Sequence, residues 1–239
     1  MQAMIFAAGL GTRLKEETAN KPKALVDIGG KPLLQHAIEK LTTDGVTQIV
    51  VNVHHFSDQI INFIKSKNWG TPVLISNESD KLLETGGGLK FASHLFSQDE
   101  PILIYNTDIL SNINLRELLN EHLKTKAIAT LVVRKRETQR YFKFDSEHNL
   151  VGWINKNTGE TKIARPNNFQ EATEMAFSGI HIVEPQIFDF MPEEDRFSII
   201  KVYLELAKTI DIKGYFDNSD LWMDVGKPVQ LEEARKLFG

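Results

Sequence analysis

The chain has no cysteine among its 239 residues, so it can form neither disulfide bonds nor thiolate metal sites. It also lacks an apolar run long enough to cross a membrane. Its first residues lack the basic leading region of a signal peptide, and their apolar run ends at once in glycines. We therefore expect a cytoplasmic protein with no membrane partner.

The chain also has no strong excess of positive or of negative residues. The 28 basic and 32 acidic residues give a net charge of −4, whereas nucleic-acid binding usually needs a basic stripe. We therefore expect no nucleic-acid partner. Hydrophobic residues make up 41% of the chain and charged residues 25%, which is ordinary globular composition. The length suits a single domain over residues 1–239.

Hydrophobic periodicity predicts strands alternating with helices along the first half of the chain. The predicted strands are 4–8, 48–53, 73–76, 101–106 and 127–134, and the predicted helices are 32–42, 58–65, 89–96 and 115–124. This alternation favours an α/β fold, a Rossmann-like and mostly parallel sheet flanked by helices.

The pattern changes after residue 134. Residues 141–145 and 150–154 are typical of short antiparallel strands around a turn, so we expect a small β-rich lobe inserted near 135–175. The chain then returns to predicted core elements, which are strands at 178–183, 212–216 and 221–225 and helices at 198–208 and 229–238.

A glycine-rich turn follows the first predicted strand, in the segment Ala8-Gly9-Leu10-Gly11-Thr12-Arg13. Glycines let the backbone turn tightly, and such a turn can direct several N–H groups at one anion. Arg13 and Lys23 add two cations near the same place, which is what a triphosphate requires.

Two better-known phosphate motifs do not fit this turn. The P-loop pattern G-x-x-x-x-G-K-[ST] is absent. The dinucleotide pattern G-x-G-x-x-G needs a third glycine at the position of Leu14, and no acidic residue closes a second strand where a dehydrogenase requires it. A dinucleotide-binding dehydrogenase is therefore not favoured.

Two aspartates are candidates for a metal site. Asp108 comes just after the predicted strand 101–106, at the end where open α/β sheets bind ligands. Asp224 lies far along the chain, in Trp-Met-Asp-Val-Gly-Lys-Pro. Two carboxylates suit Mg²⁺, which is often held by one or two carboxylates together with substrate phosphates. A lone aspartate more often caps a helix or forms a turn.

The pattern Gly-x-Gly-Thr-Arg followed by Pro-Lys, with both aspartate segments, resembles the sugar-phosphate nucleotidyltransferase family across most of the chain. The resemblance implies transfer of a nucleotidyl group from a nucleoside triphosphate to a sugar 1-phosphate, with Mg²⁺ as cofactor and pyrophosphate as leaving group. It implies these roles: catalytic Arg13 and Lys23; nucleotide-binding Ala8, Gly9, Gly11, Thr12, Asn77, Gly86 and Gly87; sugar-binding Glu84, Asn106, Ser178 and Gly179; metal-binding Asp108 and Asp224.

The segment Glu-Thr-Gly-Gly-Gly at residues 84–88 looks most like uridylyltransferases for N-acetylmuramic acid 1-phosphate, and like some mannose- and heptose-1-phosphate enzymes. UTP is therefore the first expectation, and a guanylyltransferase making GDP-mannose or GDP-heptose is the alternative. Cytidylyl transfer to a phosphoalcohol ranks below both. A catalytically silent nucleotide-sugar regulator is the alternative of another class, but all four charged site residues are present.

Two positions depart from the family pattern. Thr107 and Arg140 stand where many relatives have glycine. Arg140 also belongs to a basic segment, residues 134–140, which could meet the sugar phosphate. For most of these residues we expect a solvated charged turn instead.

Overall fold

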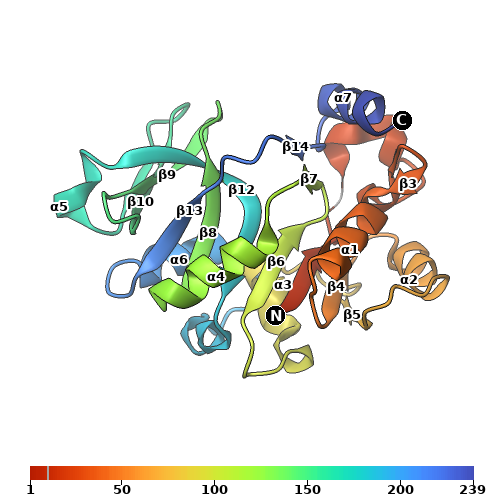
Figure 1. Cartoon of the computed structure of the whole chain (residues 1–239), viewed down its shortest axis with the longest axis horizontal. Coiled ribbons are helices and arrows are strands. Elements are labelled where there is room, and N and C mark those ends of the chain that lie inside the picture. The colour runs from red at the N-terminus through yellow and green to blue at the C-terminus, as the bar shows by residue number, and fades with distance from the viewer. Residues whose placement is uncertain (10) are drawn as a thin grey trace.

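The computed structural model describes residues 1–9 and 11–239, without the side chain of Lys15. It is an α/β structure around a mixed, mostly parallel sheet (Figure 1), which confirms the predicted fold class. At its centre, β1 (Gln2–Phe6) pairs in parallel with β4 (Ile49–Val53) and β6 (Ile102–Asn106). Next to β4 lies β5 (Val73–Asn77), again parallel. The apolar sequences of these strands fit a sheet that is covered on both faces.

The other half of the sheet is built around one long strand, β12 (Thr173–Val183), which joins β6 in antiparallel orientation. The strands on this side are β8 (Ala129–Arg134), β9 (Arg140–Phe144), β10 (Leu150–Asn155), β11 (Thr161–Ile163) and β13 (Ile212–Phe216). Strands β8 and β9 both pair with β12, while β10 and β11 extend the edge of the sheet beyond β9. Most of the residues predicted as an inserted lobe therefore continue the sheet at one end.

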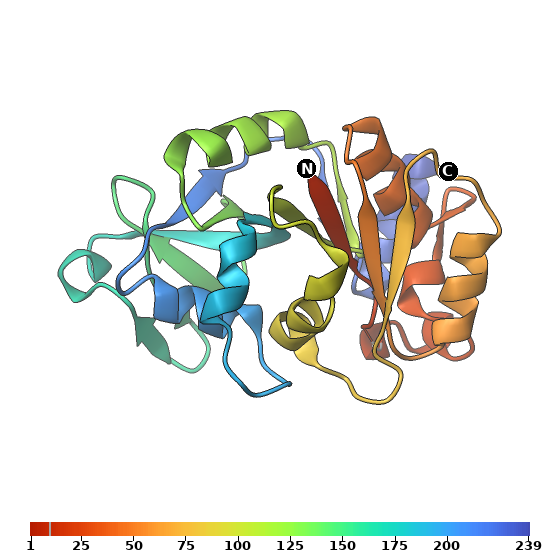
Figure 2. The same ribbon diagram turned by 90° about the horizontal axis from the view of Figure 1, so that it is seen from below.

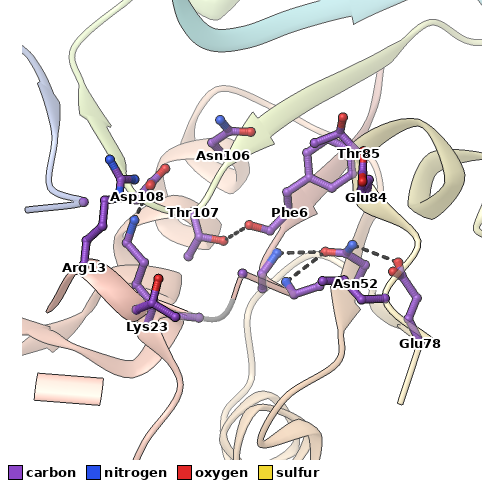
Figure 3. A pocket seen from close by; sticks show the side chains of 18 residues that line it. Phe6, Arg13, Lys23, Asn52, Glu78, Glu84, Thr85, Asn106, Thr107 and Asp108 are labelled. Carbon is purple, nitrogen blue, oxygen red and sulfur yellow. Dashed lines mark hydrogen bonds and ion pairs between the residues drawn. The ribbon is translucent and has the colours of Figure 1, made fainter. Parts of the chain in front are cut away.

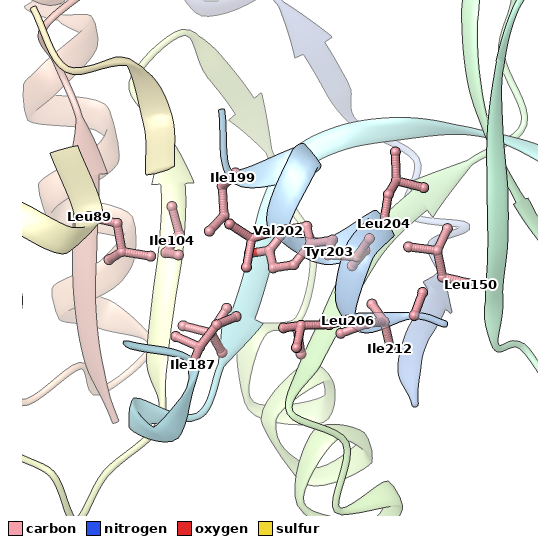
Figure 4. Packing of buried hydrophobic residues seen from close by; sticks show 14 of the residues in the cluster. Leu89, Ile104, Leu150, Ile187, Ile199, Val202, Tyr203, Leu204, Leu206 and Ile212 are labelled. Atoms are coloured by element: carbon pink, nitrogen blue, oxygen red, sulfur yellow. The ribbon is translucent and has the colours of Figure 1, made fainter. Parts of the chain in front are cut away.

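Helices cover both faces of the sheet (Figure 2). One face carries α1 (Leu33–Thr43), α2 (Ser57–Lys65) and α4 (Leu115–Thr125). The other carries α3 (Glu84–Phe91), α6 (Ile199–Leu206) and the 3₁₀ helix η4 (Pro185–Phe190), which pack around β6 and β12 (Figure 4). Along β1, Ala3 and Ile5 pack on the first face and Met4 on the second, as the alternation of a strand requires.

A third, smaller cluster joins the two ends of the chain. The helix α7 (Pro228–Phe238) packs on the hairpin of β2 (Asp27–Ile28) and β3 (Lys31–Pro32). The remaining elements are η1 (Thr12–Thr18), η2 (Lys23–Leu25), η3 (Ser93–Leu95), α5 (Pro166–Phe169), β7 (Ile109–Ser111) and β14 (Trp222–Asp224). This packing brings the C-terminal segment next to the glycine-rich turn.

One predicted helix begins earlier than expected. The sequence predicts a helix at 89–96 after a glycine loop, but α3 spans Glu84–Phe91 and contains all three glycines. Within the described residues, no helix has both the length and the apolar character needed to cross a bilayer.

Candidate active site

A cavity of about 450 Å³ opens where the parallel strands β1, β4, β5 and β6 end (Figure 3). The carboxyl ends of parallel strands lie at one edge of a sheet, which is the usual ligand site of open α/β folds. The residues around the cavity are Phe6, Ala7, Ala8, Gly9, Gly11, Thr12, Arg13, Lys23, Ala24, Asn52, Glu78, Leu82, Glu84, Thr85, Asn106, Thr107, Asp108 and Gly226.

The glycines of the first turn have different roles. Gly11 has a φ of +66°, and a Cβ there would lie 2.9 Å from Cγ2 of Thr18 and 3.0 Å from Cβ of Lys23. The absence of a side chain thus lets the segment that carries Lys23 pack against the turn. A Cβ on Gly9 would meet no described atom within 4 Å, so this backbone is open on its cavity side. Leu10, between them, lies outside the described residues.

The two predicted cations converge on the C-terminal segment. The ammonium group of Lys23 forms an ion pair with Asp108. A Cβ on Gly226 would lie 2.7 Å from Nη2 of Arg13 and 3.1 Å from Nζ of Lys23. The same point lies 2.7 Å from Oδ1 of Asp224. Two cations and two carboxylates therefore meet at one side of the cavity.

The two aspartates are brought together by a small antiparallel ladder. Asp224 in β14 lies opposite Ile109 in β7, and the N–H of Val225 donates to the carbonyl of Asp108 over 2.9 Å. Oδ1 of Asp224 accepts the N–H of Gly226 over 2.9 Å. The described residues contain no group of three or more His, Cys, Asp or Glu side chains placed to hold a metal ion.

Asn52 is a site residue that the sequence reasoning missed. Its Oδ1 accepts the backbone N–H groups of Ala7, over 2.8 Å, and Ala8, over 3.3 Å. Its Nδ2 donates to Oε1 of Glu78 over 2.8 Å. One buried side chain therefore joins the glycine-rich turn after β1 to the end of β5 (Figure 3). The signal was present, since an asparagine interrupts the apolar strand Ile-Val-Val-Asn-Val.

Glu78 was missed too, although it follows β5 directly. Only 4% of Glu78 is exposed, and its Oε2 is buried without a hydrogen-bond partner among the described residues. Burial raises the pKa of the Glu78 carboxyl above its ordinary value, while the hydrogen bond from Asn52 and the nearby backbone of Leu83 oppose that rise. A carboxyl that is easily protonated therefore faces the cavity.

The glycines of α3 are used for packing. A Cβ on Gly87 would lie 1.9 Å from the carbonyl oxygen of Asp195, and one on Gly86 would lie 2.4 Å from the ring of Phe197. Both backbone N–H groups donate to the carbonyl of Phe197, over 3.2 and 2.9 Å. Gly86 and Gly87, which we expected to contact the nucleotide, contact residues 195–197 and are not among the residues that line this cavity. Glu84 does line it and forms an ion pair with Arg196.

The residues expected to bind the sugar occupy different environments. Asn106 lines the cavity, and Gly179, with a φ of +75°, packs on it: a Cβ would lie 2.8 Å from Nδ2 of Asn106. Ser178 is fully buried and does not reach the cavity, but its carbonyl accepts the indole N–H of Trp222 over 3.0 Å. Asn77, expected to contact the nucleotide, lines a second hollow together with Gly87.

Thr107, which stands where a glycine was expected, has a structural contact. Its hydroxyl donates to the carbonyl of Phe6, and its backbone N–H approaches the same oxygen at 3.3 Å. The ends of β6 and β1 are thus joined beside Asp108.

The fold and the site together define an α/β protein with a glycine-rich turn and a carboxylate pair at the carboxyl edge of its sheet. The model of the nucleotidyl transferase family matches residues 2–238, and the chain belongs to this family. The resemblance seen in the sequence is thereby confirmed.

Among characterised relatives, the N-acetylmuramate alpha-1-phosphate uridylyltransferase of Caulobacter vibrioides is 31% identical over 95% of this chain and 92% of its own length. The mannose-1-phosphate guanyltransferase of Yarrowia lipolytica is also 31% identical, over 100% of this chain. The chain spans only 64% of that relative's length. Among solved structures, HddC from Yersinia pseudotuberculosis has the same fold, with a TM-score of 0.80 at 24% identity over 100% of this chain and 99% of its own.

Proposed function

We propose that the protein transfers a nucleotidyl group from a nucleoside triphosphate to a sugar 1-phosphate. The observation that carries this proposal is the convergence of Arg13, Lys23, Asp108 and Asp224 beside a glycine-rich turn at one cavity. Family membership supports the same reaction. An oxygen of the sugar phosphate attacks the α-phosphorus, the bond from that phosphorus to the bridging oxygen breaks, and pyrophosphate leaves with the electron pair.

The residues of the chain align the reactants and neutralise charge. The open backbone at Gly9 receives the phosphates, and Arg13 holds the leaving pyrophosphate. Lys23 exchanges its contact with Asp108 for a phosphate oxygen, which stabilises the charge that develops in the transition state. No enzyme nucleophile is needed, because the attacking phosphate already carries negative charge.

The carboxylates of Asp108 and Asp224 fit a Mg²⁺ site. Their backbones are adjacent in the β7–β14 ladder, and both supply the hard oxygen atoms that Mg²⁺ prefers. Two carboxylates suffice, since substrate phosphates and water usually complete the coordination. The metal when bound would offset charge on the reacting phosphates.

UTP is the proposed donor, and GTP is the alternative. The uridylyltransferase relative supports UTP, because this chain covers 92% of its length. The guanyltransferase relative supports GTP through an equal identity over 100% of this chain. N-acetylmuramic acid 1-phosphate is accordingly the first acceptor to test, followed by mannose 1-phosphate and heptose 1-phosphate.

Pyrophosphate release tests the whole proposal. The purified protein with Mg²⁺ is given each of the four ribonucleoside triphosphates or dTTP, crossed with the three acceptors and glucose 1-phosphate. We expect release with one donor and acceptor pair, led by UTP with N-acetylmuramic acid 1-phosphate. Release only with GTP and a mannose or heptose phosphate would select the alternative. Tight nucleotide binding without release from any pair would instead indicate a silent nucleotide-sugar regulator.

A further inference from the structure

The segment between β8 and β9 brings one arginine onto the strand that carries Asp224. The Cζ atom of Arg136 lies 4.6 Å from the ring centroid of Trp222, so the guanidinium lies over the indole in a cation–π contact. Its Nη2 donates to the carbonyl of Phe177 over 2.9 Å. The ring itself is fixed, because the indole N–H of Trp222 donates to the carbonyl of Ser178. Arg136 is therefore held in place and is not part of a solvated turn.

The charge of Arg136 is not balanced by an ion pair. Among the described residues no carboxylate lies within 4.0 Å of its guanidinium, and its Nε is buried without a hydrogen-bond partner. Burial lowers the pKa of the Arg136 guanidinium, and the charge of Asp224 opposes that change. The neighbouring Arg134 differs, since it pairs with Asp217 over 3.1 Å. Because partly buried charges are normally paired, Arg136 is suited to receive an anion.

The position of Arg136 relates it to the reaction. Trp222 and Asp224 are alternate residues of β14, so their side chains leave the strand on the same side. Gly226, beside Arg13 and Lys23, follows two residues later. Arg136 and the two cations of the turn thus lie near opposite ends of the segment 222–226, with Asp224 between them. In an in-line displacement, the attacking and leaving groups lie on opposite sides of the phosphorus.

We propose that Arg136 binds the phosphate of the sugar 1-phosphate, at the end of the site opposite the leaving pyrophosphate. This inference rests on the proposed function. The contact with Trp222 holds the guanidinium in place, and the N–H groups of its Nη atoms that are not used within the protein donate to the phosphate. Arg136 is then an acceptor-specific binding residue, while Arg13 and Lys23 bind the triphosphate.

Steady-state kinetics with both substrates varied separately tests this assignment. Arg136→Met should raise KM for the sugar 1-phosphate about 10- to 100-fold, the effect of losing a charge-assisted hydrogen bond, and leave KM for the triphosphate within about 2-fold. Arg136→Lys should recover little of the loss, because an ammonium group lacks the planar fork. Lys135→Met, which removes an exposed cation from the adjacent position, should match the wild type.

Calorimetric titration of the same proteins with sugar 1-phosphate, and thermal melting, complete the test. An unchanged KM for the acceptor in Arg136→Met would overturn the proposal, as would an equal rise for both substrates or a rise for the triphosphate alone. If Arg136→Met does not fold, the acceptor KM of Arg136→Lys decides in its place. If the wild type itself releases no pyrophosphate, the proposed function fails separately. The titrations then decide whether Arg136 binds the phosphate. Binding of the sugar 1-phosphate to the wild type that is weaker in Arg136→Met supports the proposal. Equal binding to both proteins, or no binding to the wild type, overturns it.

Discussion

The ammonium group of Lys23 forms an ion pair with the carboxylate of Asp108, which joins the glycine-rich turn to the end of β6. Both side chains are mostly buried, with 12% and 21% of their surfaces exposed. Among the described residues, Arg13 takes part in no ion pair, although its guanidinium lies beside Gly226. One cation of the site is thus paired internally, while the other is available to an incoming phosphate.

Replacing Lys23 tests its role in charge stabilisation. We expect Lys23→Met to lower kcat about 100- to 1,000-fold, the usual effect of losing one group that stabilises transition-state charge. Lys21→Met is the matched control, because Lys21 is more exposed and its ion pair, with Glu17, is long at 3.8 Å. Turnover by pyrophosphate release and the thermal midpoint should be measured for both. Near-normal turnover in Lys23→Met would exclude this role for the residue.

Removing a carboxylate tests the metal site. Asp108→Asn should raise the Mg²⁺ concentration that gives half-maximal turnover at least about 10-fold, because a neutral amide is a weaker ligand for a hard cation. The variant also leaves Lys23 without its charged partner, so triphosphate binding without metal should tighten. Asp220→Asn, at an exposed position near β14, is the control. An unchanged Mg²⁺ requirement in Asp108→Asn would contradict the assignment.

Two glycine substitutions separate packing from ligand contact. Gly87→Ala should lower the free energy of unfolding by about 1–3 kcal/mol, because its Cβ would overlap the carbonyl of Asp195. Gly9→Ala should leave the free energy of unfolding within about 0.5 kcal/mol, since no described atom lies near the new Cβ, yet weaken triphosphate binding. Urea denaturation and nucleotide titration measure both quantities. Equal stability of the two variants would contradict the packing role of Gly87.

The strands and the glycine-rich turn could be predicted because their signals are local. An apolar run that ends in Gly-x-Gly marks both β1 and the turn. The ladder that unites Asp108 with Asp224 could not be predicted from the residues alone, since β7 and β14 have three residues each and pair across the chain. The packing of the glycines of α3 could not be predicted for a related reason. In the sequence they resemble a ligand-binding loop, but Phe197 and Asp195 lie where side chains on Gly86 and Gly87 would be, and only tertiary structure reveals these contacts.

Acid should destabilise the protein through His181. This imidazole is fully buried between Phe177 and Tyr203, and burial lowers its pKa from 6.5 to about 3. Between those values the unfolded chain binds a proton that the folded chain does not, so the free energy of unfolding falls as the pH falls from about 6.5. His181→Phe should lose this dependence, whereas the exposed His94→Asn should keep it. Urea denaturation from pH 7 to pH 4 measures it, and parallel curves for wild type and His181→Phe would contradict the assignment.

Glu78 should produce the opposite dependence. Burial raises the pKa of its carboxyl in the folded state above 4.5, so the folded chain retains a proton that the unfolded chain has released. This contribution to stability is complete at low pH and is lost as the pH rises through the raised pKa. Glu78→Gln cannot ionise and keeps an oxygen to accept from Nδ2 of Asn52. Its free energy of unfolding, relative to the wild type, should therefore increase as the pH rises from 4.5.

The control for this prediction is Glu17→Gln. Its free energy of unfolding, relative to the wild type, should change with pH in the opposite direction. A hydrogen bond from Arg235 lowers the pKa of Glu17, so the wild type gains stability relative to that variant as its carboxyl ionises. Urea denaturation of the three proteins between pH 3.5 and pH 7.5 compares the slopes directly. If Glu78→Gln and the wild type lose or gain stability in parallel, the buried carboxyl beside the glycine-rich turn is already ionised at acid pH. The cavity would then hold a fixed negative charge beside the glycine-rich turn, which would oppose the binding of phosphate there.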